Sequence, residues 1–272
     1  MEYELGIIGA GKIGSGIVKG LIEKRALSKD DIIISDISEE LLNSNKKEFG
    51  INITKSNKDV FLFSKTIIIA VKPNLIGKIF EEIKGTNLNE KLIISVAAGV
   101  PTKFIESIVP NTPIIRVMPN ISLSIGYSPS CYSLGKNSDE KHEQEFIRIF
   151  QNLGSVIRVD ESLMDAVTGL SGSGPAYVFM FLKSLVDGGV KSGLSEEISR
   201  KLALDTVYGA VLMATKTNKS FDELINMVKT PGGTTEKGIL KLEEYLMDKS
   251  VSEAVIAATK RSKEMGEVYG KC

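Results

Sequence analysis

The chain has 272 residues, of which 42% are hydrophobic and 25% charged, and it carries 34 basic and 34 acidic side chains. This length allows two domains that each bury a core, and the composition excludes the disordered and fibrous classes. The balanced charge argues against nucleic acid or an anionic membrane as a partner and favours a small-molecule ligand.

The two cysteines, Cys131 and Cys272, lie far apart in the sequence. They have neither the spacing of a metal site nor that of a redox motif, so we expect no disulfide framework and no metal centre. The first residues lack a signal-peptide pattern, and no apolar run approaches the ~20 residues of a membrane span. These features predict a cytoplasmic protein without a membrane segment.

Short β-branched runs alternate with amphipathic segments over the first 160 residues. Strands are predicted at Glu4–Gly9, Asp31–Asp36, Thr66–Val71, Lys91–Val96 and Pro113–Met118, and helices at Lys12–Arg25, Ser38–Phe49 and Leu75–Ile83. Continuous apolar runs are typical of strands that are buried on both faces. The βαβ order predicts an α/β fold with a doubly wound parallel sheet over residues 1–160.

No further β-run follows, and residues 161–272 are predicted to form an all-helical domain. Its helices are predicted at Pro175–Ser192, Ser195–Thr217, Ser220–Val228, Thr234–Asp248 and Ser250–Val268. Ser195, Ser220 and Ser250 are candidate N-caps, since each precedes a helical run. The first helix is apolar nearly all round over Tyr177–Leu182, so we expect it to be enclosed, and a second subunit is one candidate cover.

The stretch GIIGAGKIG places Gly9, Gly11 and Gly14 in a G-x-G-x-x-G pattern directly after the first predicted strand. In this context Gly9 permits a tight turn, Gly11 leaves room for a pyrophosphate, and Gly14 lets the helix approach the strand. The phosphates would bind the free N–H groups at the helix N-terminus. The pattern predicts a dinucleotide site, and an ordinary glycine-rich turn is the alternative.

Asp36 ends the second predicted strand, 22 positions after Gly14. This is close to the ~20-residue spacing of the acid that binds the adenosine ribose. A carboxylate there accepts hydrogen bonds from both ribose hydroxyls and repels a 2′-phosphate, and the following residues include Glu39 and Glu40 but no cation. We therefore expect NADH to be favoured over NADPH; the alternative is that Asp36 only caps the next helix.

Two segments of small residues follow later strands, Ala70–Pro73 and Ser95–Gly99. Open α/β sheets bind ligands at the carboxyl ends of their strands, where small residues let the backbone approach a nicotinamide ribose. Pro73 ends the strand and fixes the turn. Lys72 either reaches a phosphate or stays solvated, as most single lysines do.

Six segments in order resemble the pyrroline-5-carboxylate reductase family: GIIGAGKIGSGI, IIIAVKPNLI, IISVAAGV, IIRVMPN, VTGLSGSGPAYVFMFLKSLVDGGVKSGL and TPGGTT. The resemblance covers essentially the whole chain. It implies an N-terminal Rossmann domain and a C-terminal helical domain through which a homodimer forms, with dimers often assembled into larger rings. The implied reaction is hydride transfer from NADH or NADPH to the C=N bond of 1-pyrroline-5-carboxylate, which gives L-proline in the last step of proline biosynthesis.

Roles for individual residues follow from the resemblance and, for Ser35 and Asp36, from their place at the end of the second strand. The expected cofactor contacts are Gly9, Ala10, Gly11, Lys12, Ile13, Gly14, Ser35, Asp36, Asn57, Ala70, Val71, Lys72, Pro73, Ser95, Ala97 and Ala98. The expected substrate contacts are Ser171, Gly172, Gly174, Gly232, Gly233, Thr234 and Thr235. The chain departs from the family pattern at Ile13, where Met is frequent, and in MPNIS, where Met-Pro-Asn-Thr-Pro is more usual. Asp36 stands where many relatives carry residues suited to a 2′-phosphate, which leaves the cofactor's identity open.

Within TPGGTT, two glycines precede a helix predicted to begin near Thr234. A helix N-terminus behind a glycine turn is suited to bind a carboxylate. Thr235 is the candidate catalytic residue, as a hydrogen-bond partner of the ring nitrogen, while Thr234 is expected to cap the helix; a plain helix boundary is the alternative. A protonated imine is already electrophilic, so the protein's task is to bring hydride donor and acceptor to about 3 to 3.5 Å.

Two other functions remain as alternatives. A β-hydroxyacid dehydrogenase-like oxidoreductase would carry a catalytic lysine four residues after Gly174, where Val178 stands, and Lys183 comes nine residues after it. A non-catalytic NAD(P)-binding sensor would have no need of the GGTT loop. His142 lies on a charged helix face and is expected to be solvated, and Tyr177 is expected to pack in the core.

Overall fold

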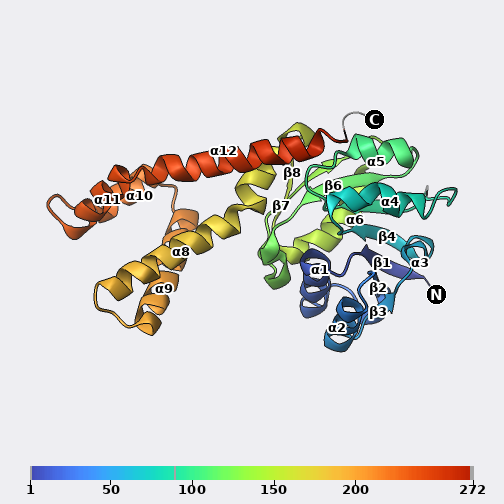
Figure 1. The fold of residues 1–272 in the computed structure, drawn as a ribbon, viewed down its shortest axis with the longest axis horizontal. Helices are drawn as coiled ribbons and strands as arrows, with labels where there is room; N and C mark the ends of the chain where they lie inside the picture. Colours follow the sequence, from blue (N-terminus) through green and yellow to red (C-terminus); the bar gives the residue numbers. More distant parts are fainter. Residues whose placement is uncertain (1, 89, 270–272) are drawn as a thin grey trace. The chain divides into compact units, whose positions relative to one another are not determined.

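The computed structural model describes residues 2–88 and 90–269, and the chain forms two compact units (Figure 1). Unit 1 comprises residues 1–173 and 256–272, and unit 2 comprises residues 174–255. These packing units differ from a division at residue 160 in two places. The segment after residue 160 stays with the sheet, because Met164 is fully buried beside Met118 and Cys131, and the end of the chain returns to unit 1. The functional division at residue 160 stays a prediction.

Unit 1 is built on one eight-stranded sheet in the order β3-β2-β1-β4-β5-β6-β7-β8. The strands are β1 Tyr3–Ile8, β2 Ile32–Ser35, β3 Asn52–Thr54, β4 Ser64–Ile69, β5 Leu92–Ser95, β6 Ile114–Met118, β7 Ser130–Leu134 and β8 Val156–Arg158. All neighbours are parallel except β6 and β7, which pair antiparallel. The α/β class is confirmed, and the five predicted strands form, whereas β3, β7 and β8 were not predicted and β7 breaks the purely parallel order.

Seven helices lie in the described part of unit 1 that precedes residue 174. They are α1 Lys12–Glu23, α2 Glu39–Phe49, α3 Asn57–Phe63, α4 Ile76–Glu81, α5 Thr102–Ile108, α6 Glu140–Phe150 and α7 Met164–Val167. Unit 2 holds α8 Gly174–Lys191, α9 Glu196–Lys216, α10 Phe221–Val228 and α11 Thr234–Glu244. The last helix, α12 Met247–Gly266, begins in unit 2 and ends in unit 1.

Helices cover both faces of the sheet, as the doubly wound prediction requires (Figure 1). Side chains of α1, α2 and α6 form one core with Ile7, Ile34 and Ile68 of the strands. Side chains of α3, α4 and α5 form a second core with Ile67 and Ile69 on the opposite face. Because successive residues of a strand point to opposite faces, an unbroken isoleucine run serves both cores at once.

Serine caps explain several helix starts. The hydroxyls of Ser195 and Ser220 accept hydrogen bonds from Ile198 N and Glu223 N, so both predicted caps are confirmed. The Ser250 prediction is wrong, because α12 begins three residues earlier, at Met247, and the Ser250 hydroxyl donates to the carbonyl of Leu246, which precedes the helix.

Unit 2 has almost no interior of its own. In this unit, all of whose residues are described, only Ser199 and Ala203 are buried. On α8, Phe179 is 63% exposed and Met180 is 74% exposed, so the expected enclosure of this helix is not provided within one chain. The expectation for Tyr177 is met only in part: it is half-buried, and its hydroxyl donates to the Ala254 carbonyl at 3.3 Å. Among the described residues, no helix has the length and apolar character needed to cross a membrane.

Candidate functional site

The glycine loop between β1 and α1 has the geometry that a dinucleotide requires. Gly9 has φ +107°, a backbone conformation that favours glycine, and a Cβ there would clash with the Ala70 carbonyl. A Cβ at Gly14 would overlap the Gly9 carbonyl oxygen, so the helix packs against the loop as closely as a glycine allows. At Gly11, by contrast, a Cβ would meet nothing within 4 Å. The open space at Gly11, beside the N-terminus of α1, fits the pyrophosphate of NADH or NADPH.

Hydrogen bonds fix this loop on the sheet. Gly9 N donates to the Ser35 carbonyl at 2.8 Å, which joins the loop to the end of β2. Ser15 Oγ donates to the Ala10 carbonyl at 2.8 Å and accepts from the side-chain amide of Asn45 at 2.9 Å. The contacts of Ser15 and Asn45 were not predicted, because the positions of these residues on α1 and α2 give no sign of contact before the two helices are packed together.

The Asp36 carboxylate accepts backbone hydrogen bonds from the glycine loop and from the residue before α2. Its Oδ2 accepts from Ala10 N at 2.7 Å, and its Oδ1 accepts from Ser38 N at 2.8 Å. The cap of α2 is Ser38, whose hydroxyl accepts from Leu41 N, so Asp36 is not the helix cap that the alternative interpretation supposed. The carboxylate is therefore held in a fixed position against the glycine loop.

The lysine that follows β3 is paired with an acidic side chain at the start of α2. Lys55 Nζ lies 2.8 Å from Glu39 Oε2, and this hydrogen bond lowers the pKa of the exposed Glu39 carboxyl. Lys55 is thus already paired with the acidic side chain that begins α2.

Asn57, at the start of α3, lies between two polar partners. Its Oδ1 accepts from Ser35 Oγ at 2.8 Å, and its Nδ2 donates to Glu82 Oε2 at 2.9 Å. Ser35 is fully buried at the end of β2. Three predicted cofactor contacts, Ser35, Asp36 and Asn57, therefore cluster at the carboxyl edge of the sheet.

The ends of β4 and β5 lie at the same edge. Ser95 is fully buried with Ala97 N donating to its hydroxyl at 3.4 Å, and Ala98 packs against the cluster of Met118, Cys131 and Met164. Lys72 is exposed, as both of its predicted roles, a phosphate contact or a solvated side chain, require. The order β2-β1-β4-β5 thus brings the four predicted cofactor segments together.

The end of α12 supports the segment after β5. Gly99 has φ +73°, and a Cβ there would stand 3.1 Å from the Ser262 carbonyl and 3.2 Å from Gly266 N. Ser262 Oγ also donates to Asp165 Oδ1 at 2.6 Å. This support was not predicted, since it joins residues more than 150 positions apart in the chain.

The SGSG segment contributes an unusual turn. Thr168–Gly172 is π-helical. This form is rare in proteins as a whole, but where it occurs it is often at a functional site. The Ser171 carbonyl accepts from the side-chain amide of Asn120 at 3.2 Å, while Ser171 Oγ is enclosed and has no hydrogen-bond partner among the described residues. Ser171 and Gly172 thus lie by the end of β6, and their neighbour Asn120 was not predicted as a site residue.

The GGTT loop lies in unit 2. Gly232 has φ +72°, Gly233 is the N-cap of α11, and Thr234 is its first helical residue. The predicted capping role of Thr234 is wrong, since no side chain caps this helix. Thr235 is the one polar side chain among those that line an apolar groove of about 480 Å³ between α8, α9, α10 and α11.

The predicted site residues therefore form two groups. The cofactor segments, Ser171 and Gly172 belong to unit 1, whereas Gly174 and Gly232–Thr235 belong to unit 2. Assembly of the two groups into one substrate site stays a prediction.

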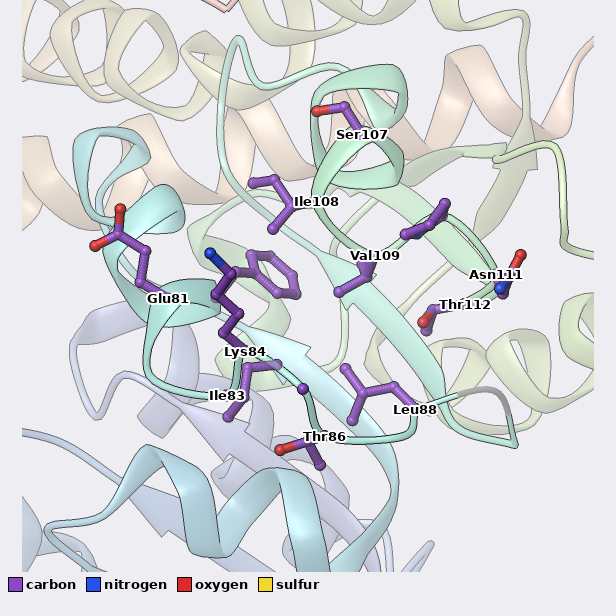
Figure 2. Close-up of a pocket in the computed structure, with 13 residues that line it drawn as sticks. Glu81, Ile83, Lys84, Thr86, Leu88, Ser107, Ile108, Val109, Asn111 and Thr112 are labelled. Atoms are coloured by element: carbon purple, nitrogen blue, oxygen red, sulfur yellow. The ribbon is translucent and has the colours of Figure 1, made fainter.

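Another cavity, of about 460 Å³, lies between the ends of α4 and α5 (Figure 2). Figure 2 shows Ile83, Leu88 and Val109 around it, from the segments that lead into β5 and β6. This is the amino edge of the sheet, opposite the edge where open α/β sheets bind ligands. None of the predicted site residues lines this cavity.

The fold and the glycine-rich carboxyl edge define a dinucleotide-dependent oxidoreductase. A family model described as pyrroline-5-carboxylate reductase dimerisation matches residues 161–265, and one described as NADP oxidoreductase, coenzyme F420-dependent, matches residues 4–99. The pyrroline-5-carboxylate reductase of Methanosarcina acetivorans is 38% identical over 98% of this chain and 99% of its own length, and that of Arabidopsis thaliana is 36% identical over 98% and 96%. The crystal structure of Plasmodium falciparum pyrroline carboxylate reductase with NADP bound has a TM-score of 0.91 and 33% identity, over 97% of this chain and 98% of that one.

The chain belongs to the pyrroline-5-carboxylate reductase family. This membership confirms the resemblance, and it decides against the β-hydroxyacid dehydrogenase alternative. It also agrees with the two-part organisation, because one model covers the glycine-rich half and the other covers the helical half.

Proposed function

We propose that the protein reduces 1-pyrroline-5-carboxylate to L-proline with NADH or NADPH. The reaction adds one hydride and one proton across the ring C=N bond and leaves the oxidised dinucleotide. The observation that carries the proposal is the glycine loop, where Gly9 and Gly14 shape the turn and Gly11 leaves open space at the N-terminus of α1. Similarity to reductases of this name along the whole chain supplies the substrate.

In the proposed mechanism, unit 1 binds and orients the cofactor. The N–H groups at the start of α1 bind the pyrophosphate, and Asp36 binds the adenosine ribose. The Ser95–Gly99 segment, supported by α12, positions the nicotinamide end. The bound dinucleotide supplies the hydride from C4 of its dihydronicotinamide ring.

Unit 2 supplies most of the substrate contacts, and Ser171 and Gly172 of unit 1 supply the others. The N–H groups of the GGTT loop bind the carboxylate, and Thr235 donates or accepts a hydrogen bond at the ring nitrogen. No strong acid is required, because a protonated imine is already an electrophile. The contribution of these residues is to hold the imine carbon at about 3 to 3.5 Å from the hydride donor.

The proposal includes a preference for NADH. Asp36 is fixed by Ala10 N and Ser38 N, and the nearby Lys55 is paired with Glu39. A 2′-phosphate at this edge would therefore meet the Asp36 carboxylate, while Lys55 is already bound to Glu39. The Plasmodium falciparum protein has NADP bound, so the fold itself accepts a 2′-phosphate, and the proposed preference rests on Asp36 and its surroundings in this chain.

The proposal also includes a homodimer formed through unit 2, with a ring of dimers as the larger assembly. Unit 2 buries only Ser199 and Ala203 by itself, although Phe179 and Met180 stand exposed on α8. A set of helices without a core is not stable alone, and a second copy would bury these faces. We place the enzyme in the cytoplasm, which agrees with the free, buried thiol of Cys131; Cys272 lies outside the described residues.

Purified protein incubated with 1-pyrroline-5-carboxylate tests the proposal, with NADH and NADPH run in parallel and proline measured directly. We expect stoichiometric proline formation and cofactor oxidation, with the higher kcat/KM for NADH. Cofactor binding without turnover would instead indicate the NAD(P)-binding sensor. Hydroxyacid-dependent reduction of NAD without proline formation would restore the dehydrogenase alternative.

A further inference from the structure

The carboxylate of Glu236 lies against the loop to which we assign the substrate carboxylate. Its Oε2 accepts a hydrogen bond from Gly232 N at 2.8 Å. Gly232 has φ +72°, a conformation that favours glycine, and a Cβ at this position would meet nothing within 4 Å. One N–H of the anion-binding loop is thus already bound to a carboxylate of its own chain.

This contact differs from an ordinary capping box, and the same unit offers a direct comparison. At α10, Glu223 accepts from the backbone N–H of the N-cap, Ser220, whose hydroxyl accepts from Glu223 N in return. At α11, the N-cap is Gly233, which has no side chain to reciprocate, and its N–H donates to the Thr230 carbonyl at 3.0 Å. Glu236 instead reaches one residue further back, to the turn before the helix.

We propose that Glu236 is a specificity-determining residue that competes with the substrate carboxylate for the Gly232 N–H and so sets the affinity of the site for carboxylates. This inference rests on the proposed function of the GGTT loop. A ligand carboxylate bound there must displace the Glu236 carboxylate or approach it closely, and both events oppose binding. Because 1-pyrroline-5-carboxylate and proline carry the same carboxylate, Glu236 weakens the binding of both and promotes product release.

The variant Glu236→Gln tests this competition. The glutamine side-chain oxygen can still accept from Gly232 N, but the charge is removed. Two unit charges about 5 Å apart in a water-exposed site repel by an amount equivalent to about fourfold in affinity. We expect KM for 1-pyrroline-5-carboxylate and the inhibition constant of proline each to fall by about fourfold, with kcat not reduced and the KM of the dinucleotide unchanged.

Two controls isolate the charge at this position. Glu243→Gln makes the same charge change near the other end of α11, where the side chain is exposed, and should leave KM unchanged. Cyclopentanecarboxylate and its neutral carboxamide serve as paired inhibitors with the same ring. Glu236→Gln should tighten inhibition by the carboxylate and leave that by the carboxamide as it was.

The outcomes separate this inference from the function on which it rests. If Thr235→Ala leaves proline formation unchanged, the assignment of the loop to the substrate fails. If Thr235→Ala impairs turnover while Glu236→Gln leaves KM unchanged or raises it, the competition is overturned and the loop assignment stands. A KM that rises in Glu236→Ala but is unaltered in Glu236→Gln would also overturn it, since Glu236 would then only brace the loop.

Discussion

Gly14 packs so closely against Gly9 that a single added methyl group would overlap the Gly9 carbonyl oxygen. Gly14→Ala should therefore disturb the glycine loop even without cofactor, since overpacking a close contact costs about 1–3 kcal/mol. We expect a lower melting temperature of the apoprotein and weaker dinucleotide binding. Differential scanning fluorimetry and a fluorescence titration with NADH measure the two effects.

Gly11→Ala is the matched variant, because its methyl group would meet only open space. It should leave the melting temperature of the apoprotein unchanged and still weaken NADH binding, by about tenfold or more if the methyl group enters the pyrophosphate position. Unaltered NADH affinity in Gly11→Ala would show that the pyrophosphate does not lie beside this residue.

Thr235→Ala tests the substrate end. Loss of one hydrogen bond to the ring nitrogen, worth about 0.5–1.5 kcal/mol, should reduce kcat/KM for 1-pyrroline-5-carboxylate by about 2- to 12-fold, while NADH affinity persists. Thr234→Ala is the control for stability, because Thr234 makes no capping hydrogen bond at the same helix start. Steady-state kinetics identical to wild type in Thr235→Ala would rule out a catalytic role.

Asp36→Asn tests the cofactor preference. A 2′-phosphate carries close to two negative charges, and at about 5 Å through water one carboxylate disfavours it by about 1.6 kcal/mol. Removing the charge should raise the ratio of kcat/KM for NADPH to that for NADH by about tenfold. The ratio cancels any general damage from the lost bond to Ala10 N or Ser38 N, and Asp30→Asn, before β2, is the charge-matched control. An unmoved ratio would mean that Asp36 does not face the 2′ position.

Met180→Asp tests the dimer. If a second copy covers the exposed α8 face, the Met180 side chain of each protomer contributes about 2 kcal/mol by burial. Loss of both side chains should raise the Kd of the dimer by about a thousandfold. Light scattering should show monomers, and circular dichroism should show loss of helix because unit 2 has no core of its own. Lys183→Gln, whose ion pair with Asp187 is exposed, should stay dimeric. A fully helical, active monomer in Met180→Asp would contradict the proposed interface.

The sequence predicted the strands with the strongest apolar runs to within two residues. Runs such as Thr66–Ile69 are recognisable because they are buried on both faces. The missed strands lack that signal: β7 reads SCYSL, and β3 and β8 have three residues each. The start of α12 was missed because Leu246, with φ +53°, makes the break between α11 and α12 without a glycine or a serine cap.

The glycine pattern and the predicted parallel strands together indicated where the expected cofactor segments meet, because the carboxyl ends of parallel strands share one edge. What could not be predicted is which groups those residues bind within the protein itself. Asp36 reaches Ala10 N, and Glu236 reaches Gly232 N, by side-chain torsions that no spacing rule specifies. The role of α12 in supporting Gly99 depends on a contact between distant parts of the chain, which a pattern along the sequence does not encode.

The return of α12 to unit 1 makes the helical part of this protein a poor module for exchange. A chimera joined to a relative at one point near residue 173 would keep the Ser95–Gly99 segment from one parent and take Ser262 and Gly266 from the other. Even an added methyl group at Gly99 would stand only 3.1 Å from the Ser262 carbonyl oxygen, so a mismatch between the parents would alter the segment that we assign to the nicotinamide. Recombination of such enzymes should succeed when it uses two crossover points, near residues 173 and 255, so that the last turns of α12 travel with the sheet they support.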